Sequence, residues 1–204
     1  MTVHLKHWKT FCAAHKANPA LCDAETRARL NRFAARFRLA ARISGLTAKG
    51  YSAQALRGYS AGIRLMLAYT AAEQLGTALQ APVTTWELPD SVLAARLRQV
   101  LRKPSERREL FTHETLRKRL QTFISGQTDN IRIAATALRV LVAHGGFTPT
   151  GTDALTHKGA QTIDDLANRL RDECNNRLTA WFGRLPTDHY PATHAGPHTA
   201  FADT

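Results

Sequence analysis

The chain has 204 residues, which suits one globular domain with a small appendage. Hydrophobic residues make up 44% of the chain and charged residues 22%, a balance that excludes wholesale disorder. Lysine and arginine number 28 against 16 acidic residues, and the resulting net charge of +12 favours a polyanionic partner.

The distribution of proline and of helix-forming residues predicts an all-α fold. No proline occurs between Pro19 and Pro82 or between Pro104 and Pro149, and alanine, leucine and arginine dominate these stretches. Such residues favour helices, whereas strands would show alternating β-branched residues and frequent turn signals. We therefore expect a bundle of five to seven helices.

Capping residues, glycines and prolines mark the ends of the predicted helices. Asp23 is suited to begin a helix, Pro104 to end one, and Gly145 to close another. Thr162 and Asp165 have the spacing of a capping box and predict the start of the last helix. In chain order the predicted helices cover residues 4–16, 23–43, 52–79, 91–103, 111–124, 129–144 and 162–185.

We divide the chain into three parts. Residues 1–50 are expected to form a helical pair packed on the bundle, and residues 51–185 form the main helical domain. Residues 186–204 are rich in proline, threonine and histidine and lack apolar periodicity. We expect them to form a disordered tail that can be deleted without unfolding the domain.

The longest predicted helix, residues 52–79, carries apolar residues at helical spacing, among them Ile63, Met66 and Leu67. Gly58 and Gly62 lie four residues apart on it. Because neither has a side chain, this spacing predicts that another helix approaches the backbone closely there.

Three cysteines, Cys12, Cys22 and Cys174, form no CxxC motif and are odd in number, as expected of a reduced intracellular protein. The N-terminal residues show no signal peptide, and no stretch approaches the roughly 18 apolar residues of a membrane helix. We expect a cytoplasmic protein with no membrane association, no metal site and no cofactor.

The most distinctive local feature is Arg139-Val-Leu-Val-Ala-His144-Gly-Gly, at the end of a predicted helix. Arginine binds phosphate through two hydrogen bonds, and histidine transfers protons near neutral pH. On an ideal helix the two side chains point about 140° apart and do not face each other. They come together only if the last turn of the helix unwinds or if two copies of the chain meet across a symmetric interface. We therefore predict a homodimer with residues 129–144 near its two-fold axis. The alternative is a structural arginine and a histidine that interacts with the helix dipole.

The sequence resembles the HEPN superfamily of all-α domains, members of which occur in bacterial toxin and defence proteins. The resemblance covers residues 55–183. One matching stretch is ALRVLVAHGG, which is similar to the Arg-to-His-Gly stretch of those domains. The other lies earlier in the chain, YSAGIRLMLAYTAAEQL, and is similar to a long helix that often carries an acidic residue, here Glu73.

The resemblance implies an RNA-directed protein, either a metal-independent ribonuclease or a catalytically inactive nucleic-acid-binding or adaptor module. In a ribonuclease of this type, Arg139 contacts the scissile phosphate and His144 assists proton transfer, the two groups coming from two protomers. Glu73 either pairs with an arginine such as Arg139 or faces solvent. Many active members have a polar residue after the arginine, where this chain has Val140, so both alternatives stay open. An antitoxin or a defence-system protein is the implied partner.

Two further groups of basic residues are candidates for contacts with RNA phosphates. One is an arginine stripe at helical spacing within residues 23–43, and the other lies between residues 96 and 119. Either group is also explained as a solvated charged face, and a basic face that binds an acidic protein is a third interpretation. The candidate residues are Arg29, Arg32, Arg36, Arg102, Lys103, Arg107 and Arg108.

Overall fold

Seven α-helices and two short 3₁₀ turns form the part of the chain that this computed structural model describes, residues 5–107, 111–152 and 154–185. Those residues contain no β-strand, only an isolated bridge between Pro89 and Asn130. The all-α prediction is therefore confirmed. In chain order the elements are α1 (Trp8–Ala17), η1 (Pro19–Leu21), α2 (Ala24–Arg42), α3 (Ala53–Ala78), η2 (Val83–Thr85), α4 (Ser91–Glu106), α5 (Glu114–Ile124), α6 (Ile131–Ala143) and α7 (His157–Phe182).

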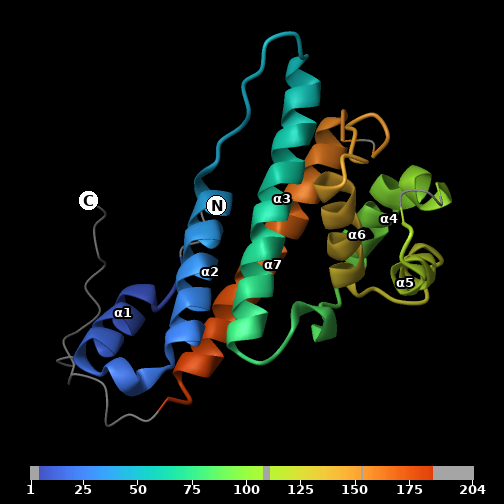
Figure 1. Ribbon diagram of the computed structural model, residues 1–204. Helices are drawn as coiled ribbons and strands as arrows, with labels where there is room; N and C mark the ends of the chain where they lie inside the picture. Colours follow the sequence, from blue (N-terminus) through green and yellow to red (C-terminus); the bar gives the residue numbers. More distant parts are fainter. Residues whose placement is uncertain (1–4, 108–110, 153, 186–204) are drawn as a thin grey trace.

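Helix α3 is the central element of the bundle and packs against α2, α6 and α7 (Figure 1). Helix α4 contacts α5, α6 and α7, and the three helices α4, α5 and α6 lie together on the side of α3 opposite α2 (Figure 1). This arrangement places the predicted Arg139–His144 segment next to α3 and α5. Within the described ranges, no helix is both long enough and apolar enough to cross a lipid bilayer.

One continuous apolar core runs through the bundle. Leu30, Phe33 and Phe37, which lie at helical spacing on α2, are fully buried. Residues that were expected to form the apolar pattern of α3, such as Ile63, are only half-buried. Because helices cover α3 on several sides, its buried positions are largely small residues, for example Ala68.

Other parts of the chain do lie close to the backbone of α3 at Gly58 and Gly62. Most of the contacting atoms belong to the connection between α6 and α7. A Cβ atom at Gly58 would lie 2.8 Å from the carbonyl oxygen of Ala154 and 2.8 Å from Pro149 Cβ. At Gly62 it would lie 3.1 Å from the ring of Phe147. The two glycines therefore permit a close approach, as expected, and at Gly62 helix α6 shares in it through Val142 Cγ2 at 3.3 Å.

Two predicted helix boundaries are wrong because local signals are ambiguous. Helix α4 does not end at Pro104 but continues to Glu106. In the last turn a proline costs the helix only one backbone hydrogen bond, and the ring of Pro104 is buried. Helix α7 begins at His157, where Thr156 Oγ1 accepts a hydrogen bond from Gly159 N at 2.9 Å. Thr162 lies inside α7 and donates to the carbonyl of an earlier turn.

The starts of two other helices differ from the prediction by a few residues. Helix α1 begins at Trp8 because His7 has a positive φ of 57°, which a right-handed helix excludes. Helix α5 begins at Glu114, because Phe111 is buried ahead of it in a non-helical segment. The predicted tail, residues 186–204, lies outside the described residues.

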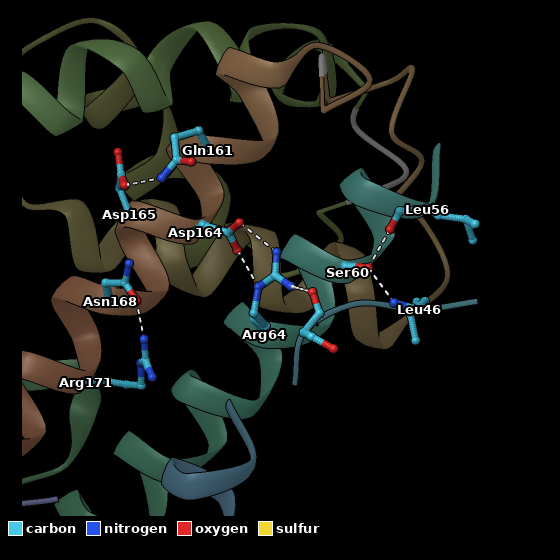
Figure 2. A network of polar contacts seen from close by, with 10 residues as sticks. Leu46, Leu56, Ser60, Arg64, Gln161, Asp164, Asp165, Asn168 and Arg171 are labelled. Atoms are coloured by element: carbon cyan, nitrogen blue, oxygen red, sulfur yellow. Dashed lines mark hydrogen bonds and ion pairs between the residues drawn. The ribbon is translucent and has the colours of Figure 1, made fainter. Parts of the chain in front are cut away.

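A polar network joins α3 to α7 and to the α2–α3 connection (Figure 2). Arg64 Nε and Nη2 each donate to the Asp164 carboxylate at 2.7 Å, and Arg64 Nη1 donates to Ser44 O at 3.3 Å. Ser60 Oγ donates to Leu56 O and accepts from the backbone N–H of the α2–α3 connection. The bidentate pair fixes the position of α7 along α3.

Candidate functional site

A cavity of about 650 Å³ lies between α5, α6 and η2, and we call it the α5–α6 cavity. Four of its lining residues are arginines or histidines, four are threonines, and none of the lining residues in the described part of the chain is acidic. Its lining comprises Thr84, Phe111, Thr112, His113, Thr115, Leu116, Arg119, Arg132, Thr136, Val140, Leu141, His144 and Gly146.

Helical periodicity explains the wall that α6 contributes. Arg132, Thr136, Val140 and His144 follow one another at intervals of four residues, so their side chains share one face of the helix. The opposite wall comes from the first turns of α5 and from the segment before it, which includes His113. The cavity thus lies between two helices, with Arg132 at one end of the α6 stripe and His144 at the other.

Arg132 is the buried cation of this site, with 6% of its surface exposed. Its Nε donates to the carbonyl oxygen of Trp86 at 3.2 Å. Burial lowers the pKa of Arg132, the positive charge of Arg119 lowers it further, and Tyr69 and Glu87 oppose these effects more weakly. Among the described residues, no carboxylate forms an ion pair with this guanidinium. A buried positive charge without a counter-ion is the kind of environment that favours an anionic ligand.

Asn130 holds the backbone of Arg132 at the start of α6. Its Oδ1 accepts from Arg132 N at 3.2 Å and from Leu88 N at 3.1 Å. Its Nδ2 donates to Trp86 O at 3.3 Å and to Glu87 Oε2 at 2.6 Å. The amide therefore joins the 86–88 segment to the first turn of α6 and buries the arginine between them.

The two histidines of the cavity are solvent-exposed and stand at helix ends. His144 caps the C-terminus of α6 and is followed by Gly145 with φ of 70°, which confirms the predicted glycine closure. His113 occupies the N-cap position of α5, and its side chain makes no capping hydrogen bond. Both imidazoles are thus accessible to a ligand that enters the cavity.

Arg139 lies on a different face of α6 and does not line the cavity. Its Nη2 is 3.5 Å from Glu73 Oε1, and its Cζ lies 5.9 Å from the centre of the Tyr69 ring on α3. The predicted divergence from His144 is therefore seen, because α6 remains helical through Ala143. Glu73 was expected either to pair with an arginine or to face solvent, and it pairs with Arg139, whose side chain is 32% exposed. A joint role of Arg139 and His144 stays a prediction.

The structure does not bring the predicted phosphate-binding arginines together. On α2, Arg29 pairs with Glu25 at 2.6 Å, and Arg32 Nε donates to Gln74 Oε1 at 3.1 Å. Arg36 donates to a backbone carbonyl of its own helix. The second group lies on the other side of α3, where Arg102, Lys103 and Arg107 are exposed at the end of α4 (Figure 1). Arg108 falls outside the described residues.

No family model, curated protein or solved structure matches the chain. The HEPN resemblance accordingly stays a prediction, and the α5–α6 cavity is interpreted from its own residues. In the described part of the chain, no group of three or more histidine, cysteine, aspartate or glutamate side chains is placed to hold a metal ion.

The sequence analysis selected His144 but missed His113 and Arg132 as members of the same site. One signal was available, the four-residue spacing of Arg132, Thr136, Val140 and His144, which places polar groups on one helix face. Nothing in the sequence indicated that the segment before α5 covers that face, because the two segments meet only in the folded chain.

Proposed function

We propose that the protein binds RNA at the α5–α6 cavity and cleaves it there without a metal ion. The observation that carries this proposal is the meeting of two exposed histidines and two arginines in one cavity that lacks an acidic lining residue among those described. Histidines supply a general base and a general acid, and arginines neutralise the charge of a phosphate. The net charge of +12 favours the approach of RNA to the molecule.

The reaction that these groups suit is transesterification within the RNA strand. One histidine accepts the proton of the 2′-hydroxyl as its oxygen forms a bond to phosphorus, and the bond from phosphorus to the 5′-oxygen breaks. The other histidine donates a proton to that 5′-oxygen. The products are a 2′,3′-cyclic phosphate and a 5′-hydroxyl end, and the basic lining of the cavity favours the charge that develops on the phosphorane.

Cleavage of an RNA oligonucleotide in EDTA tests the proposal. We expect His113→Ala and His144→Ala each to lower the cleavage rate by about 100-fold or more, and the double variant to be little worse than either one. His157→Ala is the matched control, because His157 is exposed on α7 and does not line the cavity. Intact RNA after incubation with the wild type, together with salt-sensitive RNA binding, would contradict cleavage and favour a binding module.

The role of Arg139 separates two arrangements of the active site. If the HEPN resemblance holds, Arg139 of one protomer acts with His144 of its partner, and Arg139→Ala abolishes cleavage. If Arg139→Ala leaves the rate unchanged while His144→Ala does not, the reaction belongs to the cavity of a single protomer. Both variants are suitable, because Arg139 is only partly buried and His144 is exposed.

The HEPN arrangement further requires a homodimer with α6 near the two-fold axis. We expect light scattering at micromolar protein concentration to give twice the chain mass of 22.6 kDa. A mass near that of one chain would contradict the dimer and, with it, the joint role of Arg139 and His144.

A further inference from the structure

We propose that Arg132 and Arg119 form a receptor for a terminal phosphate, the monoester group at the end of an RNA strand or on a single nucleotide. The inference rests on the proposed function for RNA as the ligand class and adds which part of the RNA enters the cavity. It starts from the burial of Arg132, which is 6% exposed and forms no ion pair with a carboxylate of the described residues, Glu87 acting on it only as a weaker, more distant charge.

The hydrogen bonding of Arg132 directs the ligand to its terminal nitrogens. Nε is occupied by Trp86 O at 3.2 Å, and no described residue accepts a hydrogen bond from Nη1 or Nη2. Arg119 and Arg132 line the same cavity, and the positive charge of Arg119 lowers the pKa of Arg132, so the two guanidinium groups repel each other. An anion between them removes that repulsion and supplies the missing acceptors.

The burial of Arg132 selects the end of a strand over its interior. An internal phosphodiester continues as a chain in two directions and needs an open groove, whereas a terminal phosphate continues in one direction and enters end-on. A phosphate monoester also carries a charge of about −2 near neutral pH, which matches the two arginines. An internal phosphodiester carries a single negative charge and matches them less well.

The remaining walls suit the rest of one nucleotide. Phe111, Leu116, Val140 and Leu141 provide apolar surface for a base, and threonine hydroxyls provide partners for a ribose. A volume of about 650 Å³ lies within the range of small-ligand sites. His113 and His144, which line the same cavity and are exposed, are then left for the next phosphate of the strand.

Calorimetric titration of the full chain distinguishes these ligands. The probes are adenosine 5′-monophosphate, adenosine, inorganic phosphate, and a dinucleoside monophosphate that has an internal phosphodiester and no terminal phosphate. We expect the nucleotide to bind at least about tenfold more tightly than each of the other three. Equal binding of the dinucleoside monophosphate would overturn the proposal, and equal binding of inorganic phosphate would overturn the assignment to a nucleotide end.

Two variants and a control assign the binding to these arginines. Arg119→Gln should weaken nucleotide binding by about tenfold or more, and Arg132→Lys should weaken it further because a lysine lacks the paired donors. Arg57→Gln removes the same charge at an exposed site outside the cavity and should leave the affinity unchanged. If Arg132→Lys fails to fold, as judged by circular dichroism, the exposed Arg119→Gln decides the test. Unchanged affinity of Arg119→Gln would overturn the proposal.

The outcome is separable from that of the proposed function. Nucleotide binding with the expected variant effects, but no RNA cleavage in EDTA, supports the receptor and contradicts the ribonuclease. Cleavage of RNA without preference for a terminal phosphate supports the ribonuclease and overturns the receptor.

Discussion

Replacing Asn130 with alanine is expected to lower the free energy of unfolding by about 3 kcal/mol. The side chain caps α6 through Arg132 N and also accepts from the buried backbone N–H of Leu88. Its amide nitrogen donates to Trp86 O. Alanine removes the cap, at about 1 kcal/mol, and leaves the buried N–H of Leu88 unpaired, at about 1–3 kcal/mol. Trp86 O keeps the hydrogen bond that it accepts from Arg132 Nε.

Urea denaturation monitored by circular dichroism measures this loss, and Asn18→Ala is its matched control. Asn18 also caps a helical turn through its side chain, but that single bond, to Ala20 N at 3.1 Å, is exposed. We expect the control to lose less than about 1 kcal/mol. Equal losses for the two variants would show that the buried network at Asn130 adds nothing beyond an ordinary helix cap.

Gly76→Ala is expected to destabilise the protein by about 3 kcal/mol, although alanine normally favours a helix interior. A Cβ atom at Gly76 would lie 2.7 Å from Ala81 O and 3.0 Å from Val83 N, both backbone atoms that cannot rotate away. Ala81 N also donates to Gly76 O at 2.8 Å, and Ala81 O accepts from Trp86 Nε1. The chain leaving α3 must therefore shift, and the buried Trp86 shifts with it.

Thermal unfolding of Gly76→Ala and Gly183→Ala provides the comparison. At Gly183 a Cβ atom meets nothing closer than Thr179 O at 3.5 Å, and φ is −67°, which alanine adopts without strain. We expect Gly183→Ala to be neutral or slightly stabilising, by up to about 1 kcal/mol. If Gly76→Ala unfolded at the same midpoint temperature as the wild type, the turn after α3 would have to shift without measurable loss of stability.

Helices with a polar cap and a clear apolar stripe were predictable from sequence. Asp23 caps α2 through Thr26 N at 2.8 Å, and apolar residues at helical spacing on α6, such as Leu138, are buried. The start of α7 was missed because its first turn buries small residues, Gly159 and Ala160, and an apolar stripe becomes visible only later in the helix. Small residues carry little hydrophobic signal even where they pack closely.

The candidate site was only partly predictable, because its walls are distant in sequence. His144 was selected by its residue type and its place at a helix end. Its companions depend on the segment before α5, which contributes His113, and on the 86–88 segment, which buries Arg132. Periodicity describes one helix at a time, so it predicts a polar face on α6 and not what covers that face.

The contact between α3 and α7 has a consequence for how the chain is made. Arg64 and Asp164 are 100 residues apart, and α7 is the last element to leave the ribosome among those described. At about 5–20 residues per second, the interval between the two residues is roughly 5–20 s of synthesis. Throughout that time one side of α3 has no α7 to cover it. Nascent chains that stop before His157 therefore present an uncovered alanine- and leucine-rich surface, to which chaperones or other nascent chains bind.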